Sequence, residues 1–162
     1  MVVNMIIWGL LLAIGVSDAQ RHRIPNQLVA FLLLAVVVSI LQQSSVVWSL
    51  HLKGVFITFA VGFGLYLVRI MAGGDVKLLS VLGLWLGGKT MWQAIPYMVL
   101  AGGIIGVFFL ALHLASSNVS FTQQVKGYAL QKATPGWKSK QPLVIPFAPA
   151  IVIGLAYYFY IH

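Results

Sequence analysis

The side chains best suited to chemistry in this sequence are its two carboxylates, Asp18 and Asp75. The 162 residues contain no glutamate, so a reaction that needs a carboxylic acid depends on one or both of these aspartates. If they share a site, their mutual repulsion disfavours ionising both, and one keeps a proton. The ionised group can then take a proton from an attacking water, while the protonated group polarises an amide carbonyl and donates to the leaving nitrogen. The pair therefore predicts amide hydrolysis.

The two aspartates also allow other interpretations. Asp75 follows Gly73-Gly74 and opens the apolar run 76–86, so it can be an ordinary helix cap next to the positive end of a helix dipole. Carboxylates within membrane helices also mark ion and proton paths, as in a small ion- or proton-coupled transporter or a channel. A structural assembly subunit with two capping aspartates is a third possibility. At this point the three alternatives stay open beside the hydrolase.

Other residue types narrow the possible chemistry. The sequence has no cysteine, which excludes disulfides, thiolate zinc sites and a cysteine nucleophile. Zinc proteases of the His-Glu-x-x-His type require a glutamate, which is absent here. The histidines are scattered over different loops and apolar segments, and we interpret them as packing or interfacial residues rather than metal ligands. We therefore expect no metal and no cofactor. The four histidines are His22, His51, His113 and His162.

The composition predicts an all-α, polytopic membrane protein. Apolar residues make up 60% of the sequence and charged residues 7%, which is unlike a soluble domain. A chain of this length has room for about six membrane spans of roughly 20 residues each. We expect the fourth of these to be tilted or partly non-helical, because it is short and is followed by Gly87-Gly88. The expected spans are residues 1–16, 27–41, 54–71, 76–86, 90–115 and 142–162.

The basic residues predict the orientation in the membrane. Eight of the ten lysines and arginines fall in alternate loops, around 17–27, 69–77 and 116–141, and only Lys53 and Lys89 fall on the other side. Cytoplasmic loops carry such an excess, so we expect both termini outside and both aspartates near the cytoplasmic ends of their helices. The net charge of +8 then needs no nucleic acid, since anionic lipid is the natural partner of these loops.

Prolines and glycines mark the places where helices begin or come close. Pro25 suits the first turn of a helix, and Gly73 and Gly74 allow close approach of backbone or substrate. Pro146 and Pro149 interrupt the start of the last apolar segment, which is tolerated where it is buried in protein or lines a wet cavity. The loop 116–141 is the only one long enough to cover a site.

Three motifs together resemble those of prepilin peptidases, and in particular the small ones associated with Tad/Flp-type pili. These are intramembrane aspartyl proteases of the Gly-x-Gly-Asp type. The motifs are Asp18 followed by the stretch Arg-His-Arg-Ile-Pro-Asn at 21–26, Gly-Asp-Val-Lys-Leu-Leu at 74–79, and Ile-Pro-Phe-Ala-Pro-Ala at 145–150. Two positions depart from the family pattern, because Ala72 and Ala148 stand where glycine is usual.

The resemblance implies that Asp18 and Asp75 are the catalytic pair. We add supporting or substrate-binding candidates from the same three motifs. These candidates are Pro25, Asn26, Gly73, Gly74, Lys77, Pro146 and Pro149. Lys77 can also act as a positive-inside anchor that reaches a lipid phosphate.

The resemblance further implies a function and a location. We expect an endopeptidase that removes the short basic leader of a prepilin-like protein with a single apolar helix. It would act in the bacterial inner membrane, with its active site facing the cytoplasm. Larger prepilin peptidases resemble this sequence plus a zinc-binding segment with four cysteines, and they also methylate the new N-terminus. We therefore expect residues 1–162 to form a single transmembrane peptidase domain without a methyltransferase or zinc domain, and to cleave without methylation.

Overall fold

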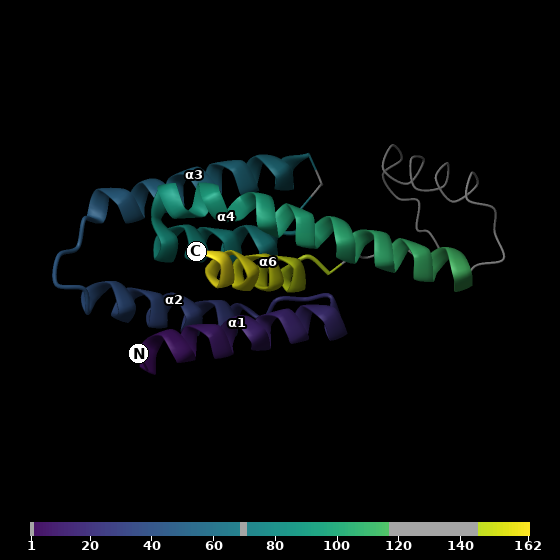
Figure 1. Cartoon of the computed structure of the whole chain (residues 1–162), viewed down its shortest axis with the longest axis horizontal. Coiled ribbons are helices and arrows are strands. Elements are labelled where there is room, and N and C mark those ends of the chain that lie inside the picture. The colour runs from purple at the N-terminus through teal and green to yellow at the C-terminus, as the bar shows by residue number, and fades with distance from the viewer. Residues whose placement is uncertain (1, 69–70, 117–145) are drawn as a thin grey trace. The chain divides into compact units, whose positions relative to one another are not determined.

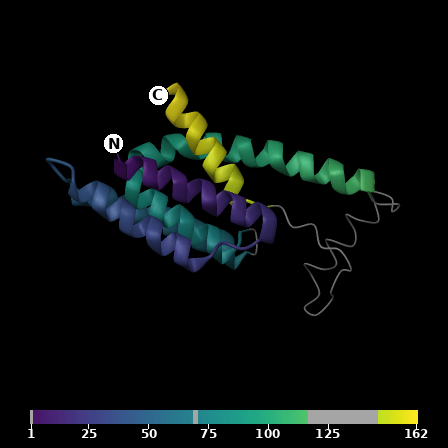
Figure 2. The same cartoon turned by 90° about the horizontal axis from the view of Figure 1, so that it is seen from below.

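The computed structural model describes residues 2–68, 71–116 and 146–162, and every regular element in these ranges is an α-helix (Figures 1 and 2). The prediction of an all-α fold is thus confirmed for the described ranges. The loop 116–141 lies outside them except for its first residue, which ends a helix. The helices are α1 (Val2–Arg21), α2 (Asn26–Leu41), α3 (Trp48–Leu67), α4 (Gly73–Ser116) and α6 (Ala148–Ile161).

The chain divides into two compact units. The first consists of Met1–Gly102 together with Pro146–His162, and the second of Gly103–Ile145. All candidate site residues belong to the first unit, and the packing described below is that of the first unit alone. In the second unit the described residues are those that end α4.

Among the residues that the structure describes, three helices are long and apolar enough to cross a membrane: α1, α3 and the part of α4 from Gly73 to Leu112. The helices α2 and α6 are apolar but shorter, with 16 and 14 residues. The chain is thus a helical protein with membrane character. The count of about six spans and the placement of both termini outside stay predictions.

Helices α1 and α2 pack along each other through one apolar face of each. The buried residues of α1 recur at the spacing of one helical face, and those of α2 do the same. The sequence analysis was wrong about the first connection, because the expected polar turn 17–26 is helical as far as Arg21. Asp18 therefore lies in the last turns of α1. The helix ends where His22 adopts a left-handed φ of 50°, and Pro25 precedes α2.

Glycines allow α3 to pack tightly against α4. A Cβ on Gly54 would overlap the carbonyl oxygen of Gly83, and a Cβ on Gly62 would lie 3.3 Å from the Val76 side chain. Contacts this close between helices are typical of small-residue interfaces in membranes. The predicted loop 42–53 is shorter than expected, since α3 begins at Trp48.

Gly87 divides α4 into two helical arms. Its φ of 71° and ψ of 169° are not helical, and the chain reverses direction there (Figures 1 and 2). This φ is accessible to glycine at little cost. Near the break, Nδ1 of His51 lies 2.7 Å from the carbonyl oxygen of Leu84, which the interrupted helix leaves available. The predicted turn at Gly87-Gly88 thus coincides with the reversal, but the preceding segment is helical already from Gly73.

Helix α6 packs against α1 and against α4. A Cβ on Gly154 would overlap the backbone of Met98 in α4, and a Cβ on Gly15 in α1 would lie 3.7 Å from the Cα of Pro149. These close approaches bring the beginning of α6 to the end of α1 that carries Asp18.

Candidate active site

Asp18 is buried near the end of α1, where α6 begins. Only 7% of its surface is exposed. One carboxylate oxygen, Oδ2, accepts a buried hydrogen bond of 3.0 Å from the backbone amide of Ala148, the first residue of α6. The side chain of Asp18 thus supplies the acceptor that a helix needs at its N-terminus. Capping was one of the roles expected from the sequence for the two aspartates, and the structure shows a bond of this kind for Asp18.

Asp75 lies in the first turn of α4 and is 6% exposed. Ala72 immediately precedes the helix, and its carbonyl oxygen accepts hydrogen bonds from the amides of Asp75 and Val76 at 3.1 and 3.3 Å. The neighbouring Gly74 packs against the link between α1 and α2, because a Cβ there would lie 3.1 Å from the Cβ of Ile24. A larger residue at 74 would therefore push the Asp75 turn away from the Asp18 helix.

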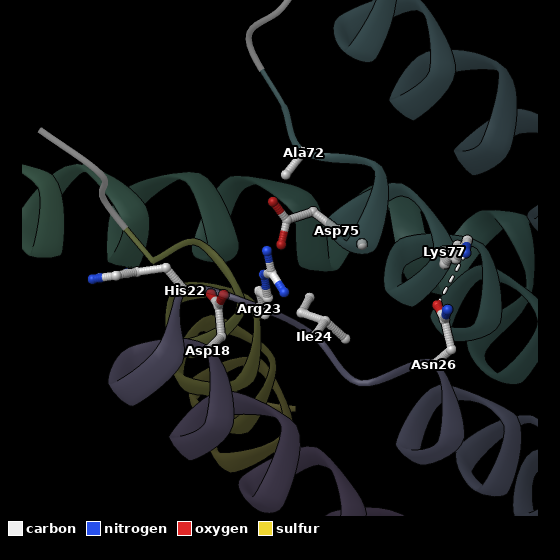
Figure 3. Close-up of a pocket in the computed structure, with 9 residues that line it drawn as sticks. Asp18, His22, Arg23, Ile24, Asn26, Ala72, Asp75 and Lys77 are labelled. Atoms are coloured by element: carbon white, nitrogen blue, oxygen red, sulfur yellow. Dashed lines mark hydrogen bonds between the residues drawn. The ribbon is translucent and has the colours of Figure 1, made fainter. Parts of the chain in front are cut away.

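Both carboxylates line one pocket, although they lie 57 positions apart in the sequence. The pocket has a volume of about 260 Å³, and one water takes up about 30 Å³ of the liquid, so several waters fit. Figure 3 shows the Asp75 carboxylate directed toward the side of the pocket where Asp18 lies. The residues that line the pocket are Asp18, His22, Arg23, Ile24, Asn26, Ala72, Gly74, Asp75 and Lys77.

Cationic side chains share this pocket with the two carboxylates. Arg23 follows α1 and Lys77 lies in α4, and both line the pocket. The ammonium group of Lys77 donates a hydrogen bond of 3.0 Å to Oδ1 of Asn26 (Figure 3). The ring of His22 points away from both carboxylates in the same view. The pocket therefore combines two acidic groups with positive charge at its wall.

The structure brings together most of the residues that the sequence singled out. Asp18, Asn26, Gly74, Asp75 and Lys77 all line the pocket. The other four candidates do not line it. Pro25 and Gly73 are next to lining residues in the chain, and Pro146 and Pro149 lie within two residues of Ala148, whose amide binds Asp18.

Other residues of the pocket were missed as site candidates. Ile24 and Arg23 lie within the first motif, so their place in the motif was an available signal. The role of the Ala148 amide could not be predicted from the residue types, because every residue except proline has a backbone N–H.

A metal site would need at least three ligands from histidine, cysteine, aspartate or glutamate side chains that lie close together. The structure shows no such group within residues 2–68, 71–116 and 146–162. Asp18 and Asp75 are the two carboxyl groups that this pocket offers for proton transfer. Independence from a metal stays a prediction.

Comparison with known proteins gives two matches. Residues 5–111 match the model of the type IV leader peptidase family. The chain is also similar to a prepilin leader peptidase/N-methyltransferase of Bacillus subtilis (strain 168), with 32% identity over 158 residues. That alignment covers 92% of this chain and 52% of the relative, so the chain spans about half of the relative's length. No solved structure matches the chain.

Proposed function

The chain belongs to the type IV leader peptidase family, and from this premise we propose that it is an aspartic endopeptidase that removes the leader of a prepilin-like protein. The observation that carries the proposal is the shared pocket of Asp18 and Asp75, the only two carboxylate side chains of the sequence. A family of peptidases supplies the reaction class, and the pocket supplies the groups that such a reaction needs.

In the proposed reaction the two carboxyl groups carry one proton between them. The ionised group accepts a proton from a water in the pocket as that water attacks the scissile carbonyl carbon. The protonated group donates a hydrogen bond to the carbonyl oxygen and thereby stabilises the tetrahedral intermediate. The proton taken from the water then passes to the leaving nitrogen as the C–N bond breaks. A new carboxyl group and a new amine result, which together contain all the atoms of the water, and the pair returns to its singly protonated state.

We propose a substrate with a short basic leader followed by a single apolar helix. The wall of the pocket carries Arg23 and Lys77, so a basic leader gains no attraction from these two side chains. Recognition then depends on the apolar helix of the substrate, which can pack in the membrane next to the enzyme. The small Tad/Flp-type pili are the proposed destination of the product.

The proposed location is a bacterial inner membrane, with the pocket at its cytoplasmic face. The positive-inside rule supports this face, because Arg21, Arg23 and Lys77 lie in or beside the pocket end of their helices.

We also propose cleavage without methylation and without a cofactor. These 162 residues contain no cysteine, whereas by resemblance the methylating segment of larger prepilin peptidases carries four. The test is cleavage of a leader-bearing substrate by purified protein in the presence of a strong chelator. Mass spectrometry of the product should show a free, unmethylated amine. Activity that the chelator abolishes and zinc restores would show that a metal site is needed.

The same purified system separates the peptidase from a transporter. Wild-type protein in detergent should cleave the substrate, whereas Asp18→Asn and Asp75→Asn should not. A transporter would instead need closed vesicles and an ion gradient before any activity appears. Full cleavage by either variant would contradict a reaction shared by the two carboxylates.

A further inference from the structure

The proposed reaction needs Asp18 to keep one orientation, and the first turn of α6 offers a contact that can provide it. The bond from the Ala148 amide to Asp18 Oδ2 is buried and joins residues 130 positions apart. We propose that the Ala148 amide is a positioning group, which fixes the Asp18 carboxylate relative to Asp75. The inference rests on the proposed function, since it assigns a task within that reaction.

The position of Ala148 explains why its amide is available to Asp18. Ala148 is the first residue of α6, and the first amides of a helix have no acceptor within that helix. Pro149, the next residue, has no N–H that could compete for the Asp18 carboxylate. The amide of Ile151 already donates to the carbonyl oxygen of Phe147 at 3.1 Å. The acceptor for the Ala148 amide therefore comes from outside the helix, and α1 supplies it.

Packing between α1 and α6 holds this contact in place. Gly15 lies three residues before Asp18, and residues at this spacing lie on the same face of a helix. A Cβ at Gly15 would lie 3.6 Å from the side chain of Val152 and 3.7 Å from the Cα of Pro149. Ala148 itself has no exposed surface. Since both helices are close packed here, the Asp18 side chain has little freedom to turn away from the amide.

A hydrogen bond at this place can have one of two consequences. If it only caps α6, its loss lowers stability and leaves the chemical step of the folded fraction unchanged. If it positions Asp18, its loss lowers kcat and has little effect on KM, because the groups that hold the substrate are untouched. The other charged or titratable groups of the pocket come from other turns or helices, and they are Arg23, Asp75, Lys77 and His22. They remain the same in both cases.

The experiment removes the N–H of Ala148 without changing a side chain. Lactic acid is incorporated in place of Ala148, which exchanges the backbone N–H for an ester oxygen. The control places lactic acid at Ala150, a buried residue of the same first turn. We expect kcat for a leader-bearing substrate to fall on the order of 10- to 100-fold for the ester at 148, with KM unchanged. The ester at 150 should keep nearly the kcat of the wild type.

The outcomes decide between the two consequences and separate the inference from the proposed function. Wild-type kcat for the ester at 148 would overturn the inference, and so would equal losses for both esters, while the peptidase assignment would stand. Failure of the wild-type protein to cleave any leader-bearing substrate would overturn both. A second measurement tests the contact itself. It compares the loss of thermal stability in the ester at 148, in Asp18→Ala and in the protein that carries both changes. Non-additive losses support the contact, and additive losses contradict it.

Discussion

Lys77 Nζ donates a hydrogen bond of 3.0 Å to Asn26 Oδ1, which joins the start of α4 to the first residue of α2. The bond spans 51 positions of the chain and lies at the wall of the pocket that contains both carboxylates. The turn that carries Asp75 is thereby tied to the link that follows Asp18. Sequence analysis left Lys77 open between a substrate contact and a lipid anchor, and the structure shows a bond within the protein.

We expect Lys77→Met and Asn26→Ala each to lower the free energy of unfolding by about 0.5–1.5 kcal/mol, the net value of one hydrogen bond. The double variant should lose little more than either single one, because both changes remove the same bond. Unfolding in detergent measures this, and Lys89→Met in the second arm of α4 serves as a control. Fully additive losses would show that the two side chains act separately.

Asp18→Asn and Asp75→Asn should each abolish cleavage of a leader-bearing substrate. Groups that act as a unit lose most of their effect at the first substitution, so the double variant should be hardly worse than either single one. The measurement is kcat/KM of each purified variant. Wild-type activity in one of them would mean that the other aspartate works alone.

The stability of the protein should depend on which residue replaces Asp18. The Asp18→Asn side chain keeps an oxygen that can accept from the Ala148 amide, whereas the Asp18→Ala variant leaves this buried amide unpaired. The free energy of unfolding of Asp18→Ala should therefore be about 1–3 kcal/mol lower than that of Asp18→Asn. Thermal unfolding of the two variants makes the comparison, and equal stability would argue against the cap.

Much of this architecture follows from patterns that the sequence displays. The apolar runs predicted helices, and Gly87-Gly88 predicted the end of the fourth apolar segment, where the structure shows that α4 reverses at Gly87. The end of α1 was missed, since Ser17 to Arg21 is polar and looked like a turn. The helix end depends on the left-handed conformation of His22, which no local pattern specifies.

The pocket could be predicted only in part. The carboxylates stood out because they are the only two in the sequence, and the distribution of basic residues predicted that both lie near one membrane face, which stays a prediction. The contact between Asp18 and Ala148 could not be predicted, because it depends on how α6 packs against α1 across 130 positions. In addition, every residue other than proline has the same backbone N–H, so the residue type at 148 does not reveal that this N–H binds Asp18.

Gly54→Ala should destabilise the protein strongly, by about 1–3 kcal/mol or more, because the new Cβ would overlap the Gly83 carbonyl oxygen. Gly64→Ala in the same helix is the matched control, since its Cβ would meet nothing within 4 Å. That variant should be neutral or more stable by about 0.5–1 kcal/mol, as alanine is the better helix former. Thermal unfolding of both variants provides the test. Similar losses in the two would show that α3 and α4 do not meet at Gly54.

The predicted orientation can be tested with single cysteines, because the sequence contains none. Ser44→Cys in the α2–α3 connection and Gln20→Cys at the end of α1 both lie at exposed positions. An impermeant thiol reagent applied to intact cells should label Ser44→Cys and leave Gln20→Cys unlabelled until the cells are opened. Labelling of both in intact cells would contradict a cytoplasmic pocket.

The bond between Asp18 and Ala148 also has a consequence for the biosynthesis of the protein. A ribosome adds roughly 5–20 residues per second, so the 130 positions between the two partners take on the order of 6–26 s to translate. During this interval the newly made α1 carries a carboxylate whose backbone donor does not yet exist. Even after Asp75 has been added, the growing chain lacks the Ala148 amide. The pocket is therefore completed only when the beginning of α6 has been synthesised and has packed against a helix made at the very start.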